Sequence, residues 1–238
     1  MGRAVNYMAI LAGVPETGKS SLVATQARAW LEAGEWVFFH DPNGQFTMPQ
    51  FGSLSVRYEN AAAWRAAAAA AAKGGAPMPR AASVGGASDE LVALVDELGK
   101  RHNTQFRTRL PMRLVVDEAS LMSKSGATHM DRADNELISN RRHRGVGISI
   151  NTQRVKQLPA PFYQTATDVF AFRGLPRSAI DHLVEMLNIR DASTMEELDA
   201  EPSHEFLHIK PGRGVVAPGA ADCAGLDPIR RTQRARDE

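Results

Sequence analysis

The stretch Gly13-Val14-Pro15-Glu16-Thr17-Gly18-Lys19-Ser20 decides the fold of this chain. It contains a glycine, four free positions and then Gly-Lys-Ser, which is the pattern of a phosphate-binding loop. The glycines let the backbone turn tightly enough for consecutive N–H groups to converge on an anion. In such a loop Lys19 reaches the outer phosphates as a point charge, and the Ser20 hydroxyl ligates Mg²⁺.

The residues on either side of the loop support this interpretation. Residues 7–11 are an apolar run that predicts a buried strand entering the loop. Residues 20–31 predict a helix leaving it, with the apolar side chains on one side and the positive dipole end at the loop. This order favours a nucleotide site over a tight turn with a surface lysine. We expect the nucleotide to be bound by Gly13, Val14, Pro15, Glu16, Thr17, Gly18, Lys19, Ser20 and Ser21.

Composition narrows the class of protein. A chain of 238 residues can bury a sizeable core as one α/β domain, and its net charge of +1 indicates neither nucleic acid nor membrane by itself. The single cysteine, Cys223, excludes an internal disulfide framework and a multi-cysteine metal site. No apolar run approaches the roughly 20 residues that span a bilayer, and Met1 leads almost directly into the first strand, leaving no room for a signal peptide. We therefore expect a soluble, cytoplasmic protein.

Strand and helix patterns alternate along the rest of the chain. Further strands are predicted at residues 35–40, 55–58, 112–116, 146–151 and 169–172, and helices at residues 61–73, 88–98, 132–144 and 177–187, with Ser88 as a helix cap. This alternation predicts a parallel sheet with helices on both faces. Residues 204–210 and 214–217 predict a hairpin. We expect one domain over residues 1–228, with a flexible insertion at about 74–88, and a charged tail at 229–238.

A pair of acids supplies the second half of the expected chemistry. The predicted strand at residues 112–116 is followed at once by Asp117 and Glu118. Beside a phosphate-binding loop, Asp117 at the strand tip would hold the metal, directly or through water. Glu118 would orient and deprotonate the water that attacks the γ-phosphate. Without the phosphate-binding loop, the simpler interpretation of Asp117 and Glu118 would be two acids at the start of a surface loop.

Two further polar features have functional and structural interpretations. Gln153 follows the strand predicted at residues 146–151, where a polar side chain can sense the γ-phosphate, or can simply meet solvent. The basic run at residues 141–144 ends a predicted helix, where positive charge complements the dipole. The same run can supply an arginine to the nucleotide of a neighbouring subunit. The residues alone leave both alternatives open.

Together these motifs resemble the FtsK–HerA superfamily of DNA-pumping ATPases. The resemblance covers the loop, the turn Asp41-Pro42-Asn43-Gly44-Gln45-Phe46, the two acids, and Arg142 through Gly145 to Thr152-Gln153-Arg154, and extends to about Arg173. It implies a RecA/FtsK–HerA-like P-loop NTPase fold, α/β with a mostly parallel central sheet flanked by helices. It also implies ATP and Mg²⁺ as cofactors, Lys19, Ser20, Asp117 and Glu118 in the roles above, Gln153 as sensor and Arg142 as the interface arginine.

The small size of the chain is similar to that of the genome-packaging ATPases of tailless, membrane-containing icosahedral viruses. That resemblance implies a homo-oligomeric ring, a hexamer, with double-stranded DNA in the pore and ATP at subunit interfaces. It implies host cytoplasm as the location, with a capsid portal vertex or membrane proteins as partners. Lys124, Arg132 and the arginine-rich tail are candidate DNA contacts.

The chain departs from the pattern in two places. Pro15 and Glu16 stand where many relatives have small residues, so the Glu16 side chain must point away from the phosphates, and Val155 stands where proline is common. The run from Arg142 to Gly145 also resembles the zonula occludens toxin-like assembly ATPases of filamentous phages, which usually carry a membrane segment. A third alternative is a nucleotide switch without turnover, for which Glu118 would have no use as a water-activating acid.

Overall fold

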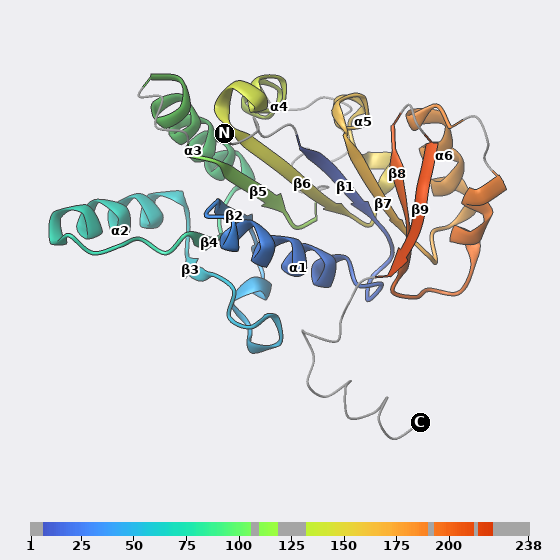
Figure 1. Cartoon of the computed structure of the whole chain (residues 1–238), viewed down its shortest axis with the longest axis horizontal. Helices are drawn as coiled ribbons and strands as arrows, with labels where there is room; N and C mark the ends of the chain where they lie inside the picture. The colour runs from blue at the N-terminus through green and yellow to red at the C-terminus, as the bar shows by residue number, and fades with distance from the viewer. Residues whose placement is uncertain (1–6, 106–109, 119–131, 190–192, 212–213, 221–238) are drawn as a thin grey trace.

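A computed structural model describes residues 7–105, 110–118, 132–189, 193–211 and 214–220. Within these residues the strands form one nine-stranded sheet with the order β3-β4-β2-β5-β6-β1-β7-β8-β9 (Figure 1). The strands are β1 (Met8–Ala12), β2 (Trp36–His40), β3 (Val56–Tyr58), β4 (Ala81–Val84), β5 (Met112–Val116), β6 (Val146–Thr152), β7 (Asp168–Phe172), β8 (Glu205–Lys210) and β9 (Gly214–Ala220). The strands from β3 to β7 in this order are parallel, whereas β8 and β9 are antiparallel. The predicted α/β fold with a mostly parallel sheet is confirmed.

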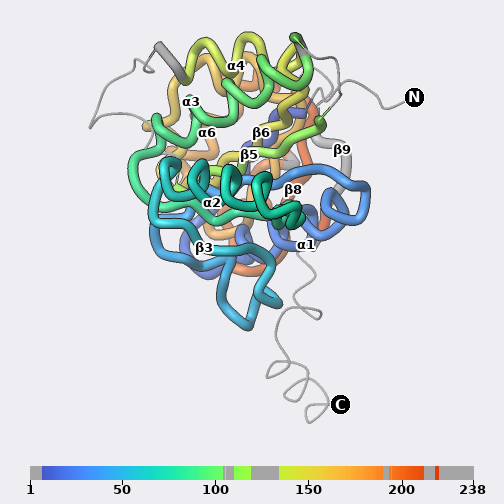
Figure 2. The backbone as a smooth tube through the Cα atoms, turned by 90° about the vertical axis from the view of Figure 1, so that its left-hand side faces the viewer, coloured from blue at the N-terminus to red at the C-terminus, as the bar shows by residue number. Residues whose placement is uncertain are grey.

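Helices cover both faces of this sheet. They are α1 (Lys19–Glu32), α2 (Ala61–Gly74), α3 (Ser88–Gly99), α4 (Arg132–Arg144), α5 (Ala160–Thr165) and α6 (Arg177–Leu187), and a π-helical turn (Lys100–Gln105) extends α3. One core lies between α1 and the sheet, and the larger core lies on the opposite face under α2 to α6 (Figure 1). Figure 2 shows α3 between α2 and α4 on that second face. No helix among the described residues is both long enough and apolar enough to span a bilayer.

Strand β1 sits between β6 and β7, and all of its residues are buried. Its side chains alternate, so that Leu11 belongs to the core under α1 and Ile10 to the core on the other face. Because the neighbouring strands are parallel, their carboxyl ends meet at one edge of the sheet. The predicted phosphate-binding loop, which follows β1, therefore lies in the middle of that edge.

The prediction of a flexible insertion at residues 74–88 is wrong. This segment contains β4, which is buried at every position and pairs with β2 on one side and β3 on the other. Its Ala81, Ala82 and Ser83 have weak intrinsic strand preference, but small side chains fit a strand that is covered on both faces. The predicted cap at Ser88 is also wrong, since Ala87 occupies the cap position of α3 and no side chain caps the helix there.

The predicted carboxyl-terminal hairpin is confirmed. Strand β8 pairs with β7 and then with β9, and the last register pair of the hairpin joins Lys210 to Gly214. Both Cys223 and the tail at residues 229–238 lie outside the described residues.

Candidate functional site

The loop after β1 has the close backbone approach that its glycines predict. A Cβ atom on Gly13 would lie 2.8 Å from both the Phe172 Cβ and the Thr17 Oγ1, so a side chain at this position meets β7 and the loop itself. Gly18, the last residue before α1, has a φ of 93°, which only glycine adopts at low cost. The Thr17 hydroxyl is buried and donates to the Val14 carbonyl at 2.9 Å. These positions fix the shape of the loop from inside.

Lys19 places its ammonium at the centre of this loop. Its Nζ donates to the Gly13 carbonyl at 2.7 Å and to the Val14 carbonyl at 2.5 Å, and the residue is 8% exposed. Burial lowers the pKa of Lys19 to about 8, while the Glu118 and Asp117 carboxylates act in the opposite direction. A buried cation held among loop carbonyls at a helix N-terminus suits an anionic ligand.

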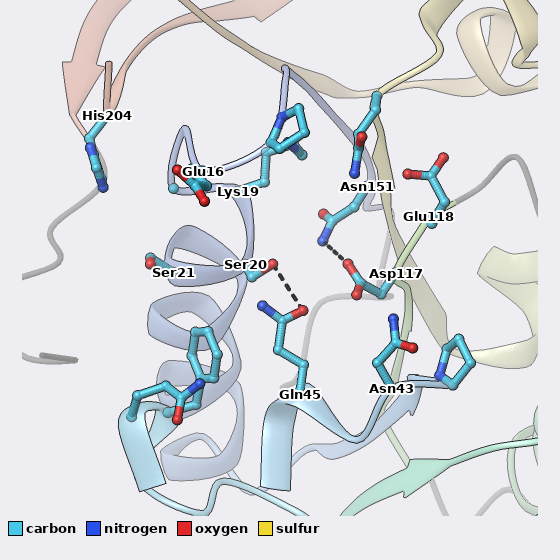
Figure 3. Close-up of a pocket in the computed structure, with 16 residues that line it drawn as sticks. Glu16, Lys19, Ser20, Ser21, Asn43, Gln45, Asp117, Glu118, Asn151 and His204 are labelled. Carbon is cyan, nitrogen blue, oxygen red and sulfur yellow. Dashed lines mark hydrogen bonds between the residues drawn. The ribbon is translucent and has the colours of Figure 1, made fainter. Parts of the chain in front are cut away.

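The sheet order brings the two acids to the loop. Strand β6 separates β5 from β1, so Asp117 after β5 and the loop after β1 flank the end of β6 at the same edge. Figure 3 shows Lys19, Ser20, Asp117 and Glu118 around one cavity, which has a volume of about 710 Å³. The cavity is also lined by Pro15, Glu16, Gly18, Ser21 and Gln153. The predicted meeting of loop and acids is therefore present in the structure.

The two acids have different environments. Asp117 accepts a hydrogen bond from the Asn151 Nδ2 at 2.9 Å, and burial raises its pKa above the usual range, an effect that this bond opposes. Glu118 has a left-handed φ of 64°, which is uncommon for a residue with a side chain and is one of the conformations found at functional sites. Glu16 shares this conformation and is exposed where it lines the cavity.

A turn after β2, organised by a buried carboxylate, completes the cavity wall. Asp41 is fully buried and accepts from the Gln45 N–H at 2.8 Å, the Phe46 N–H at 2.9 Å and the Ser83 hydroxyl at 2.8 Å. The Arg57 guanidinium donates to the Asp41 and Pro42 carbonyls. This network presents the Gln45 side chain to α1, where its Oε1 accepts from the Ser20 Oγ at 3.4 Å (Figure 3).

The arginines at residues 141–144 do not line this cavity. Gly145 donates to the Arg142 carbonyl immediately before β6 begins, so Arg142 lies at the amino edge of the sheet. The seven residues of β6 separate it from the loop edge by about 20 Å. Arg141 is buried and donates to the Ile138 and Thr165 carbonyls, and Arg144 pairs with Asp96 at 2.8 Å. Arg142 itself is exposed.

Several residues at the cavity were not predicted as site residues. Asn151 stands two residues before Gln153, which was predicted, and a further polar residue at this strand end is a signal that the sequence offered. Gln45 lay in the recognised turn, but its orientation toward Ser20 was not predicted. His204, which precedes β8, reaches the cavity from a distant part of the chain, and no local pattern indicates it (Figure 3).

The oxygen groups at the cavity are of the kind that binds Mg²⁺. The Ser20 hydroxyl, the Asp117 carboxylate and the Asn151 Oδ1, which is buried without a protein partner in the described residues, are hard oxygen groups. The part of the chain that the structure describes has no cluster of three His, Cys, Asp or Glu residues that could cage a metal. Mg²⁺ needs no such cage, since it is usually held by one or two protein groups together with waters and substrate phosphates.

Comparisons with protein-family models and with curated protein sequences find no match. Solved structures do match. The genome packaging NTPase B204 from Sulfolobus turreted icosahedral virus 2, in complex with ATP-gammaS, has a TM-score of 0.67 and 16% identity over 90% of this chain and 96% of that chain. The pCW3 conjugation coupling protein TcpA has a TM-score of 0.60 and 17% identity over 98% of this chain and 66% of that chain. VirB4 of Thermoanaerobacter pseudethanolicus has a TM-score of 0.59 and 12% identity over 93% of this chain and 92% of that chain. These similarities confirm the predicted α/β fold, and the chain resembles these NTPases in its architecture.

Proposed function

We propose that this chain is a Mg²⁺-dependent ATPase that uses hydrolysis to move double-stranded DNA. The observation that carries the proposal is the single cavity lined by Lys19 and Ser20 from α1 and by Asp117 and Glu118 after β5. A nucleotide-binding protein that only switches needs the first pair, whereas hydrolysis also needs a group that accepts a proton from water. Structural similarity to nucleotide-bound packaging and coupling proteins supports ATP as the nucleotide.

In this proposal each residue has one role. Lys19 and the loop amides bind the phosphates, and Ser20 and Asp117 hold Mg²⁺, which would neutralise phosphate charge when bound. Glu118 accepts a proton from the water that attacks the γ-phosphorus, while the bond from that phosphorus to the ADP oxygen breaks. Gln153, at the same cavity, senses the γ-phosphate or orients the water.

Arg142 acts on the nucleotide of a neighbouring subunit. Its place at the opposite edge of the sheet excludes contact with its own loop, and it is exposed, whereas Arg141 is buried and Arg144 half-buried. The end of α4 is also tightly positioned, since a Cβ on Gly99 would lie 2.8 Å from the Arg144 Cβ. A fixed helix end that exposes one arginine of the run is suited to an interface role, and it requires a ring of subunits, for which we propose a hexamer.

The proposed cargo is a viral genome that is packaged into a preformed capsid, with the ring acting in the host cytoplasm at a portal vertex. Similarity to B204 over nearly the full length of both chains supports this choice. The similarity to TcpA and VirB4 favours a second candidate, an assembly or secretion ATPase that works with membrane proteins. The candidate DNA contacts Lys124 and the tail lie outside the described residues, as does the side chain of Arg132.

The decisive experiment measures ATP hydrolysis by size-fractionated protein with and without duplex DNA. We expect turnover in the oligomeric fraction, stimulation by DNA, and loss of this stimulation at high salt because phosphate contacts are screened. Lys19→Ala should abolish turnover, and Glu118→Gln should bind ATP but not hydrolyse it. Hydrolysis without DNA stimulation would favour the second candidate. Undiminished hydrolysis in the Glu118→Gln protein would refute the assigned chemistry.

A further inference from the structure

Asn151 lies between the two halves of the proposed site. Asn151 pairs in register with Leu11 of β1. On the other side of β6 lies β5, which leads directly to Asp117. Residues in register on parallel strands point to the same face of the sheet, and Leu11 belongs to the core under α1. The Asn151 side chain therefore points to the face that carries α1 and the loop, and it is 1% exposed.

The two ends of the Asn151 amide have different surroundings. Its Nδ2 donates to the Asp117 Oδ1 at 2.9 Å. Because an ionised carboxylate accepts but does not donate, this contact fixes which end of the amide faces Asp117. The Oδ1 is buried and has no hydrogen-bond donor among the described residues. Figure 3 shows this oxygen turned toward the side on which Lys19 lies.

An unpartnered buried amide oxygen needs an explanation. Leaving such an acceptor unsatisfied costs folding free energy, whereas an apolar side chain of similar volume would avoid this cost. Asn151 lines the same cavity as Ser20 and Asp117, so its oxygen can receive a donor from a ligand in that cavity. The donors that a hydrated cation brings there are the hydrogens of its water shell.

We propose that Asn151 is a positioning residue for the metal. Its Nδ2 holds the Asp117 carboxylate through one oxygen and leaves the other free to face the cation or its water, and its Oδ1 accepts a hydrogen bond from a second water of the same shell. This inference rests on the proposed function, because it assigns a role in holding Mg²⁺ at that site. It differs from the role given to Gln153, which is exposed beyond the end of β6.

The test measures binding and does not require turnover. The affinity for a fluorescent, non-hydrolysable ATP analogue is determined in Mg²⁺ and in EDTA, and the ratio gives the gain in affinity that the metal provides. We expect Asn151→Leu to reduce this gain by about 10-fold or more, as is typical for groups that orient metal ligands, and to leave the affinity in EDTA unchanged. Asn151→Ala, which also lacks the amide but introduces no new bulk, should act in the same direction.

Ser149 provides the matched control. It lies two residues earlier on β6, faces the same side of the sheet and is also 1% exposed, so Ser149→Ala removes a buried polar group that does not reach the cavity. We expect it to keep the wild-type ratio, and thermal melting of every variant checks that it is folded. An unchanged ratio in both Asn151 variants would overturn the inference, as would an equal loss of affinity in EDTA, which would indicate a distorted loop. If the wild-type protein gained no affinity from Mg²⁺, the proposed function would fail first.

Discussion

Replacing Asp41 by asparagine tests whether the turn after β2 is held by a buried charge. The Asp41 carboxylate is fully buried and accepts from the Gln45 N–H, the Phe46 N–H and the Ser83 hydroxyl at 2.8–2.9 Å. An amide presents hydrogens at one of the two positions, so one backbone N–H of the turn loses its acceptor. The loss of that partner costs about 1–3 kcal/mol, and the remaining bonds weaken without the charge.

We therefore expect Asp41→Asn to lower the free energy of unfolding by about 2–4 kcal/mol. Urea-induced unfolding followed by circular dichroism measures this change from the midpoint, provided that the denaturant slope stays constant. Ser83→Ala is the graded control, because it deletes the side-chain donor and leaves the carboxylate and both backbone donors in place. Its expected cost is about 1 kcal/mol.

The turn also bears on ligand binding, because it presents Gln45 to Ser20 across the cavity. We expect Asp41→Asn to weaken ATP binding more than Ser83→Ala does. If Asp41→Asn changed the free energy of unfolding by less than about 0.5 kcal/mol, the range typical of ordinary surface substitutions, the buried bonds would not hold the turn. The same conclusion would follow if Ser83→Ala were the more damaging of the two.

Three further predictions concern the loop and the subunit interface. Gly13→Ala should cost about 1–3 kcal/mol of stability by overpacking against Phe172 and should lower ATP affinity; unchanged melting and binding would contradict the close approach. ATP affinity should fall as the pH rises through about 8, because the Lys19 pKa is lowered to about 8 and the neutral amine no longer attracts phosphate; titration of binding against pH should show no such fall if Lys19 lies outside the phosphate site. Arg142→Ala should lose hydrolysis but keep ATP binding, and mixing it with Glu118→Gln protein should restore part of the activity; no recovery would argue against action in trans.

The pattern of the chain predicted the sheet well where hydrophobic periodicity was strong. Strand β1 and the helix after it follow from an apolar run, a glycine-containing loop and an apolar stripe. Strand β4 could not be predicted in this way, because alanine and serine have weak strand preference and become a strand through burial between β2 and β3. Local propensity says nothing about which neighbours a segment will have, and here the neighbours decided the outcome.

The site was predictable at the loop and the acids, because each has a residue pattern with a chemical reason. Asn151 and His204 were not, since their roles depend on the order of strands in the sheet and on a segment that returns from far along the chain. The arginine run shows the same limit. The sequence left several arginines equivalent, and they differ in burial: Arg141 is buried and Arg144 half-buried, whereas Arg142 is exposed.

Asp41 and Asp117 each follow a buried strand directly, on the face that carries α1. The number of hydrogen bonds that each carboxylate accepts nevertheless indicates different roles. The oxygens of Asp41 accept from three donors of the described chain, so little of their capacity remains for a ligand. Asp117 accepts a hydrogen bond from one such donor, Asn151, among the described residues. An ionised carboxylate can accept about four hydrogen bonds. Asp117 is half-buried, and a carboxylate removed from much of its water is costly to leave with unused acceptor sites unless a cation or water fills them. For this reason Asp117, and not Asp41, is the acid to which the metal is assigned, although in the sequence each is simply the first polar residue after a strand.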